Sequence, residues 1–471
     1  MEVIKGIFGI IDSLTWGWSL IPMLIVFGVL FTIVGGFAQF RYFGRMFRVF
    51  KQTNKKGDGL SGRQALLVSI GGRVGGGNIA GIAVAISLGG PGAVFWMWLA
   101  ALIGMMTSIV ECSLAQLYKR KEADGTYRGG PAFYIVHGLG KDYRFLATIY
   151  AVALTLCYSI GFNAFQGNTV AGSALDSLGI DRIYTGIFLA IVGGIVIFGG
   201  IKRIAKAADV VVPIMSFIYI LLALIVILLN ITEIPHLIAT IVKSAFGFEE
   251  VVGGGMGAAI AQGMRRGLFS NEAGLGSAPN VAATAEVRHP VSQGISQALS
   301  VFIDTMIICS ATAFIILLSD VYVPGAKPDG VVLTQQALVF HFGEWVKYLL
   351  TFAILLFSFS SIIFNYYMGE NGVSFLFGKN AKVSVFILRI SVVAILFIGA
   401  AAPRATAVFF FSDPLMGVLA VINLLALIML FPRAVKLLKD YQSQLDNGVD
   451  EPVFDAQDFE RLDIDMKAWN K

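Results

Sequence analysis

The chain has 471 residues, of which 56% are hydrophobic and only 14% are charged, and its mean hydropathy is +0.77. Soluble proteins carry about 25% charged residues, and so much apolar surface excludes a soluble domain, so the composition predicts an integral membrane protein. The three cysteines and four histidines are scattered, which excludes a disulfide framework and a metal-ligand cluster. The net charge of +5 is attributed to basic cytoplasmic loops rather than to nucleic-acid binding.

Residues 1–40 are expected to hold an external N-terminus and one extra transmembrane helix. The opening MEVIKGIFGIIDSLTWGW lacks the basic start and the cleavage site of a signal peptide, so we expect its apolar run to be a retained span. A span needs about 20 mostly apolar residues, and lipid forces it to be helical. We therefore predict an all-α protein with eleven transmembrane helices, near 17–37, 64–88, 92–117, 145–171, 183–200, 207–230, 251–286 (interrupted), 291–319, 346–369, 383–402 and 404–431.

Lysine and arginine set the direction of the spans, because basic loops stay on the cytoplasmic side. The loop 41–63 holds seven of them and the loop 119–144 holds six, whereas the loops 172–182 and 320–334 hold one each. This alternation predicts a multi-pass plasma-membrane protein with its N-terminus outside. Residues 433–471 then form a cytoplasmic tail, which is polar, acidic and expected to be mobile from residue 440.

Two short amphipathic stretches, 236–248 and 333–345, fit neither a span nor a simple loop, and both fall on the outside. Two alternatives stay open for them. They either lie flat on the membrane surface or fold over an external vestibule as a gate.

Two glycine-rich stretches interrupt the apolar pattern, SIGGRVGGGNIAG (69–81) and VVGGGMGAAIAQGMRRGLFSNEAGLGSAPN (251–280). Each opens a set of five spans, in 64–231 and in 236–432. An odd number of spans makes the second set enter the membrane from the opposite side, which is typical of an inverted repeat with discontinuous first helices. For one glycine cluster the better reading is close helix packing, but two clusters in matching positions favour a functional break.

An unwound helix in the membrane can bind both an ion and a substrate. Unpaired backbone groups cost several kcal/mol each in hydrocarbon, so they must line a cavity or hold something. Carbonyl oxygens can replace the water around Na⁺, and the N-terminus of a half-helix carries partial positive charge that suits a carboxylate. One break can therefore hold a cation beside the carboxylate of an amino acid.

Two further stretches carry a family resemblance. GGPGAVFWMWLAALIG (89–104) and GLFSNEAGLGSAP (267–279) closely resemble signature stretches of the alanine or glycine:cation symporter family, also called sodium:alanine symporters. The similarity extends from about residue 60 to 432. It implies the leucine-transporter-type fold, with one extra helix ahead of a five-plus-five inverted repeat, and Na⁺ as the coupling ion.

VGGGN (74–78) is also similar to the first core helix of neurotransmitter:sodium symporters. That resemblance implies a sodium site and a substrate site around the two breaks. The alternatives are back-bonding of the serine hydroxyls within their own helix and interhelical hydrogen bonding by the amide of Gln166. The implied sodium ligands are the carbonyls of Gly71 and Val74 with the hydroxyls of Ser360 and Ser361, and the implied substrate-binding residues are Gly75, Gly77, Asn78, Gln166, Phe269, Ser270 and Asn271.

The chain departs from this family pattern at two further candidate substrate residues. Family members usually have threonine where Gly76 stands, and often tryptophan where Asn365 stands. Both changes remove bulk near the expected pocket, and Asn365 adds an amide. We therefore expect a roomier or more polar pocket, which adds serine and glutamine to alanine and glycine as candidate substrates.

Ionisable residues inside the membrane are functional candidates by default. Asp304 lies deep in the span 291–319 and is expected to hold a second cation or to take up a proton. Arg73 and Glu272 lie in the two breaks, and Glu111 lies towards the inner end of its span. For these three the favoured expectation is mutual pairing, for example of Arg73 with Glu272, rather than contact with substrate.

The sequence thus predicts a secondary transporter and not an enzyme, with no organic cofactor. It is expected to bring a small neutral amino acid and Na⁺ into the cell by alternating access. Its expected partners are these two substrates and the lipid bilayer, and no nucleic acid. Proton coupling through Asp304 or Glu272 is the alternative within transport. An ion channel is a third reading, but a channel usually gathers its filter around an oligomer axis, and no oligomeric state follows from the sequence.

Overall fold

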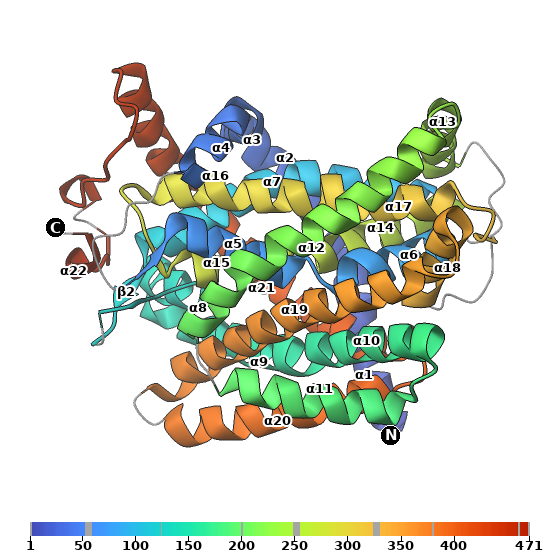
Figure 1. The fold of residues 1–471 in the computed structure, drawn as a ribbon. Coiled ribbons are helices and arrows are strands. Elements are labelled where there is room, and N and C mark those ends of the chain that lie inside the picture. Colours follow the sequence, from blue (N-terminus) through green and yellow to red (C-terminus); the bar gives the residue numbers. More distant parts are fainter. Residues whose placement is uncertain are drawn as a thin grey trace.

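The protein is almost entirely helical, which confirms the all-α prediction. The computed structural model describes residues 2–51, 59–123, 125–198, 201–247, 255–323, 330–378, 381–459 and 462–469. Most of the long helices lie side by side along one axis, and the two ends of the described chain lie towards opposite ends of that axis (Figure 1). The N-terminal part consists of α1 (Glu2–Asp12), the π-helical η1 (Ser13–Ser19), α2 (Leu20–Val34), α3 (Ala38–Arg41) and α4 (Phe43–Lys51).

The first predicted break is present in the next segment. Helix α5 ends at Arg73, and the chain becomes helical again at Gly77 with an axis bent by 48°. The elements of this half are α5 (Gly62–Arg73), η2 (Gly77–Gly81), α6 (Ile82–Gly89), α7 (Gly92–Leu117), α8 (Pro131–Tyr134), η3 (Ile135–Leu139), η4 (Lys141–Tyr143), α9 (Arg144–Leu156), η5 (Cys157–Phe162), α10 (Asn163–Leu178), α11 (Arg182–Ile197), α12 (Ile201–Leu229) and α13 (Ile234–Ala245).

The second predicted break is also present, between Asn271 and Ser277. The two expected amphipathic stretches are helices, α13 and α18, and both lie at the end of the molecule remote from the C-terminus (Figure 1). The elements of this half are α14 (Gly255–Asn271), α15 (Ser277–Ala282), α16 (Pro290–Val301), η6 (Phe302–Cys309), α17 (Ser310–Leu317), α18 (Val331–Phe342), α19 (Val346–Phe377), α20 (Ala381–Ala401) and α21 (Ala405–Asp446).

The number of membrane spans is established only in part. Among the described residues, seven helices are long and apolar enough to cross a membrane, or nine if each of two bent helix pairs is one span. Helices α11, with 16 residues, and α14, with 17, are shorter than a full span. Residues 251–254 of the predicted seventh span lie outside the described part of the chain. The count of eleven and the two repeat boundaries therefore stay predictions.

Two short strand pairs join loops at the end of the molecule where the C-terminus lies. Strand β1 (Leu60–Ser61), just before α5, pairs in parallel with β4 (Ala285–Glu286), which follows α15. Strand β2 (Arg120–Lys121) pairs antiparallel with β3 (Tyr127–Arg128). The β1–β4 pair therefore ties together the two half-helices that border the breaks on this side.

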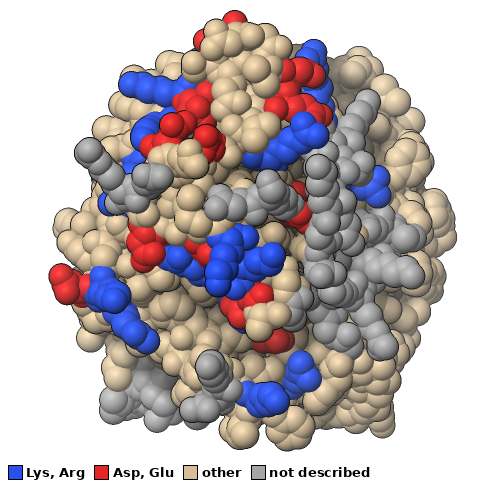
Figure 2. Space-filling view, turned by 90° about the vertical axis from the view of Figure 1, so that its left-hand side faces the viewer, with Lys and Arg blue, Asp and Glu red and all other residues tan. Residues whose placement is uncertain are grey.

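The prediction of a mobile tail is wrong. Helix α21 continues to Asp446, and the chain then folds back over this end of the molecule through η8 (Gln457–Phe459) and α22 (Met466–Trp469). Asp463 accepts a hydrogen bond from Arg120 at 2.8 Å, and the Phe454 amide donates to the Arg288 carbonyl at 2.9 Å. Basic and acidic side chains lie intermingled on this face (Figure 2). The acidic residues of the tail, whose abundance predicts disorder, thus form ion pairs with arginines near the predicted cytoplasmic loops.

Candidate functional site

The first break exposes backbone groups that side chains then satisfy. Helix α5 starts at a capping box formed by Ser61 and Gln64, and it ends where Val74 turns to an extended conformation with φ −75° and ψ 96°. Beyond it, the Gly75 amide donates to the Asn78 side-chain oxygen at 2.9 Å, and the Gly76 amide donates to Gln166 Oε1 at 3.1 Å. The unwound segment is buried, and side-chain oxygens accept the hydrogen bonds that its amides would otherwise donate within a helix.

Ser360 and Ser361 of α19 lie directly against the carbonyls at the end of α5. The Ser360 hydroxyl donates to the Gly71 carbonyl at 2.7 Å, and the Ser361 hydroxyl donates to the Gly72 carbonyl at 3.0 Å. Ser360 also donates to the carbonyl of Phe357 in its own helix at 2.8 Å, so back-bonding is part of its role. The structure thus brings together two hydroxyls and two carbonyls, which are oxygen ligands of the kind that hard cations prefer.

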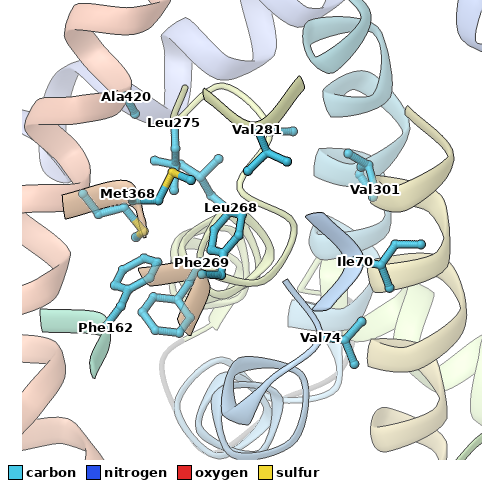
Figure 3. Packing of buried hydrophobic residues seen from close by; sticks show 14 of the residues in the cluster. Ile70, Val74, Phe162, Leu268, Phe269, Leu275, Val281, Val301, Met368 and Ala420 are labelled. Carbon is cyan, nitrogen blue, oxygen red and sulfur yellow. The ribbon is translucent and has the colours of Figure 1, made fainter. Parts of the chain in front are cut away.

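Val74 and Ile70 fill the space on another side of the first break. Both are buried, and both side chains point towards the helix that carries Val301 (Figure 3). On the other side, the Phe269 ring lies 4.4 Å from that of Phe162, centroid to centroid. Added to Gly77, a Cβ would lie 3.2 Å from the Phe269 ring. This glycine therefore allows the first break to approach the end of α14 closely.

The second break is strained at one residue. Glu272 has φ +55°, a left-handed conformation that costs a non-glycine residue about 1–3 kcal/mol. Just before it, Asn271 uses its side-chain oxygen to accept from the Ala273 amide at 3.0 Å. Gly274 and Gly276 also have positive φ, at 94° and 81°. The turn therefore requires the glycines of residues 272–276 (EAGLG), and Phe269 and Ser270, just before it, lie next to Gly77 of the first break.

Asp304 joins the two breaks. Its carboxylate accepts from the Asn78 amide at 2.6 Å, from the Ser270 hydroxyl at 2.8 Å and from the neighbouring Thr305 hydroxyl at 2.8 Å. Asp304 is fully buried and lies on the π-helix η6. Asn78 is therefore held at both ends of its side chain, by Asp304 and by the Gly75 amide.

The side chains around Gly76 correct one sequence inference. A Cβ on Gly76 would lie 2.9 Å from the Thr169 hydroxyl oxygen and 3.0 Å from Gln166 Oε1. The space that a threonine would take is already filled, so the expectation of a roomier pocket is wrong at this position. The other departure, Asn365, is buried and donates to the Asn163 side-chain oxygen at 3.2 Å. Asn365 therefore adds the expected amide, and this amide is hydrogen-bonded to the side-chain amide of Asn163.

The buried charges do not pair as expected. Arg73 donates to the Gln297 carbonyl at 3.3 Å and to the Ser300 hydroxyl, and within the described residues it forms no ion pair with Glu272. Glu272 instead accepts from the Ser277 hydroxyl at 2.5 Å. Glu111 accepts from Asn423 at 2.9 Å and from the Gly274 amide at 3.3 Å. The carboxylates thus hold the second break through neutral donors.

Arg265 and Arg266, which stand before the second break, do form ion pairs. Arg266 is bound to Asp413 of α21 within the interior, and its guanidinium lies 3.7 Å from the centroid of the Phe409 ring. Arg265 binds Asp12 of α1 through two hydrogen bonds of 3.1 and 2.9 Å. These contacts join α14 to α1 and to α21.

Sequence reasoning missed three polar residues that line the breaks. Thr169 lies beside Gly76, Asn423 binds the Gly274 carbonyl at 2.9 Å, and Thr312 donates to the Asn78 carbonyl at 2.7 Å. Thr169 follows Gln166 by three positions, which places both on one helix face, so this signal was available. Asn423 and Thr312 do not lie three or four positions from a predicted site residue, so no helical spacing marks them in the sequence.

The chain is similar to known proteins along most of its length. Residues 1–456 match the sodium:alanine symporter family. The amino-acid carrier protein AlsT of Bacillus subtilis is 46% identical over 97% of this chain and 96% of its own length. The probable sodium/glutamine symporter GlnT of the same organism is 45% identical over 96% and 94%. The sodium/proton-dependent alanine carrier protein of Bacillus sp. PS3 is 36% identical over 88% and 95%.

Solved structures with low sequence identity share the fold. MhsT in complex with L-phenylalanine superposes with a TM-score of 0.58 at 12% identity, covering 82% of this chain and 99% of that one. A mutant form of the manganese transporter of Eremococcus coleocola gives a TM-score of 0.51 at 13% identity, covering 80% and 78%. At these identities the likeness concerns the arrangement of helices alone.

Proposed function

Because this chain belongs to the sodium:alanine symporter family, whose members are membrane transporters, we propose that it carries a small neutral amino acid together with Na⁺ into the cell. The relatives named above are carriers of amino acids, and two of their names specify alanine and glutamine. We place the protein in the plasma membrane, with its N-terminus outside and its tail in the cytoplasm, and propose alternating access between the two sides.

The observation that supports sodium coupling is the contact of Ser360 and Ser361 with the carbonyls of Gly71 and Gly72. A sodium ion would take these oxygens, with the carbonyl of Val74, as ligands in place of the serine hydrogen bonds. The ion would thereby fix α19 against the inner half of the first broken helix. Binding of the ion would thus hold α19 and α5 together, and alternating access requires these two helices to move relative to each other.

The substrate would lie between the two breaks. The amides of Gly75, Gly76 and Gly77 at the start of η2 suit a carboxylate, which would replace the side-chain oxygens of Asn78 and Gln166 as acceptors of the first two. Gln166 and Ser270 would reach the substrate from α10 and α14, with Phe269 closing the space and Asn271 and Asn365 beside it. Asn78 is held by Asp304, so it would shape the first break around the carboxylate. The oxygens of Asp304 and Ser270 form the candidate site for a second cation.

The membrane potential adds a driving force to such a transport cycle. One Na⁺ moving with a zwitterionic amino acid carries one net charge, and 100 mV then supplies about 2.3 kcal/mol. This corresponds to roughly fifty-fold accumulation of the amino acid before any sodium gradient is added.

Uptake into proteoliposomes tests the proposal. Labelled alanine, glycine, serine and glutamine are offered separately, with an imposed gradient of Na⁺, of Li⁺ or of protons alone. We expect saturable uptake that requires Na⁺ and grows with an inside-negative potential. The second candidate, proton coupling, is favoured by the buried carboxylate of Asp304, and uptake driven by protons without Na⁺ would replace the main proposal with it.

A further inference from the structure

A cavity of about 330 Å³ opens between the end of α2 and the last part of α21. This volume lies in the range of small-ligand sites, about 300–1,000 Å³. Its lining has an apolar part and a polar, basic part. The apolar part comes from Val34, Val435 and Leu438, and the polar part comes from Arg41, Tyr42, Lys439, Gln442, Ser443, Asp446 and Asn447.

The two basic side chains of this cavity are left unneutralised. Within the part of the chain that the structure describes, neither Arg41 nor Lys439 forms an ion pair. The acidic residue of the cavity, Asp446, accepts a hydrogen bond of 2.5 Å from Gln442, which in turn accepts one of 2.5 Å from the Tyr42 hydroxyl. The carboxylate is thus held on one side, and the cavity keeps a net positive charge.

The cavity lies where the bilayer meets water. The apolar span that includes α2 ends at Val34, and only 28% of its most apolar window is buried by the rest of the protein, so this helix faces lipid. Directly beyond it, Phe37 is 51% exposed and Phe40 is 50% exposed, on either side of the turn into α3. Apolar rings this exposed belong in the boundary layer of a membrane.

We propose that this cavity binds the phosphate-bearing headgroup of an anionic phospholipid. Arg41 and Lys439 would bind the phosphate, with Ser443 as a further donor, and Val34, Val435 and Leu438 would contact the start of the acyl chains. Basic pockets between helices at the cytoplasmic boundary are known to suit such headgroups. The apolar lining residues favour a lipid over a free phosphate ion. The proposal is independent of the transported substrate.

Native mass spectrometry of the purified full chain tests this assignment. Phosphatidylglycerol and phosphatidylcholine are titrated into the detergent-solubilised protein, and the bound fraction is compared with that of the double variant Arg41→Ala/Lys439→Ala. Each basic side chain near the surface is worth roughly fivefold in affinity for an anionic lipid. We therefore expect phosphatidylglycerol to bind about 25-fold more weakly to the double variant, with phosphatidylcholine unchanged.

A matched control and an opposite change sharpen the test. Arg144→Ala/Lys382→Ala removes the same charge from exposed positions on α9 and α20 that do not line the cavity, and it is expected to leave lipid binding unchanged. Asp446→Asn removes the negative charge of the cavity, so phosphatidylglycerol should bind about fivefold more tightly. This gain also tests the site if the double variant does not fold.

Three results would overturn the proposal. One is equal binding of the two lipids to the unmodified protein, because the cavity would then show no preference for an anionic headgroup. Another is an equal loss of binding in the control variant, because the effect would then be one of overall charge. The third is displacement of phosphatidylglycerol by soluble glycerol phosphate at equal concentration, which would identify a free anion as the ligand.

Discussion

Replacing Ser361 by alanine tests the proposed sodium site most directly. Its hydroxyl is fully buried and donates to the Gly72 carbonyl at 3.0 Å, with the Gly71 carbonyl at 3.4 Å. In the proposed cycle this oxygen is a ligand of the ion, and alanine removes it while leaving the backbone of α19 unchanged. The expected effect is a weaker affinity for Na⁺ at an intact amino-acid site.

The size of the effect follows from the strength of one such contact. A polar contact to a charged group contributes about 1.5–3 kcal/mol, against about 1 kcal/mol for a neutral hydrogen bond. A loss of about 1.5 kcal/mol raises the half-saturating Na⁺ concentration roughly tenfold. Ser360→Ala should have a smaller effect, because Ser360 is partly exposed and also bonded to the Phe357 carbonyl of its own helix.

The assay is initial uptake of labelled amino acid into proteoliposomes as a function of Na⁺ concentration. Ser358→Ala is the matched control, since Ser358 is buried on the same helix and its hydroxyl has no hydrogen-bond partner within the described residues. Half-saturation by amino acid, measured at saturating Na⁺, should be the same in all variants. Sodium dependence in Ser361→Ala equal to that of Ser358→Ala would refute the placement of the ion.

Three further predictions concern packing, charge and pH. Gly76→Thr should reduce uptake more than roughly tenfold, because its Cβ would lie 2.9 Å from the Thr169 hydroxyl in a core that tolerates little extra volume, and adding Thr169→Ala should restore part of it. Asp413→Ala leaves Arg266 buried without its partner and should lower the free energy of unfolding by about 3–5 kcal/mol, which denaturation of the solubilised protein measures. Burial lowers the pKa of His289 below its usual 6.5, so the stability that its neutral form contributes is full above pH 6.5 and falls below it. Thermal unfolding from about pH 7.5 to about pH 5.5 should therefore show a loss that His289→Asn, which does not titrate, lacks, and equal pH slopes would contradict this reading.

The contacts at the two helix breaks show which features of the site could be predicted from the sequence. Both helix breaks were predictable because glycine clusters in apolar spans are costly unless they have a use. The contact of Ser360 and Ser361 with the first break followed only from the resemblance, which named the carbonyls of Gly71 and Val74, whereas the serines contact those of Gly71 and Gly72. The bridge from Asp304 to Asn78 and Ser270 was not predictable, because it joins three helices whose rotation about their axes is set by packing across the bundle.

The tail shows a different limit of sequence reasoning. Its acidic composition is typical of disorder, yet three of its acidic residues pair with arginines far away in the sequence, namely Asp450 with Arg45, Glu451 with Arg288 and Asp463 with Arg120. The composition of the tail alone cannot show that basic partners for its acidic residues lie elsewhere in the chain. The Gly76 inference failed for the same reason, because the filling side chain of Thr169 comes from another helix.

The parallel pairing of β1 with β4 constrains how the proposed transporter can open. Leu60 and Ser61 lead directly into α5, whereas Ala285 and Glu286 follow α15. Any motion that opens this end while keeping the strand pair intact must carry the two half-helices together. The carbonyls at the end of α5 would then move away from Ser360 and Ser361 on α19. Opening would thereby separate the proposed sodium ligands, and the bound ion would favour the closed arrangement until it leaves.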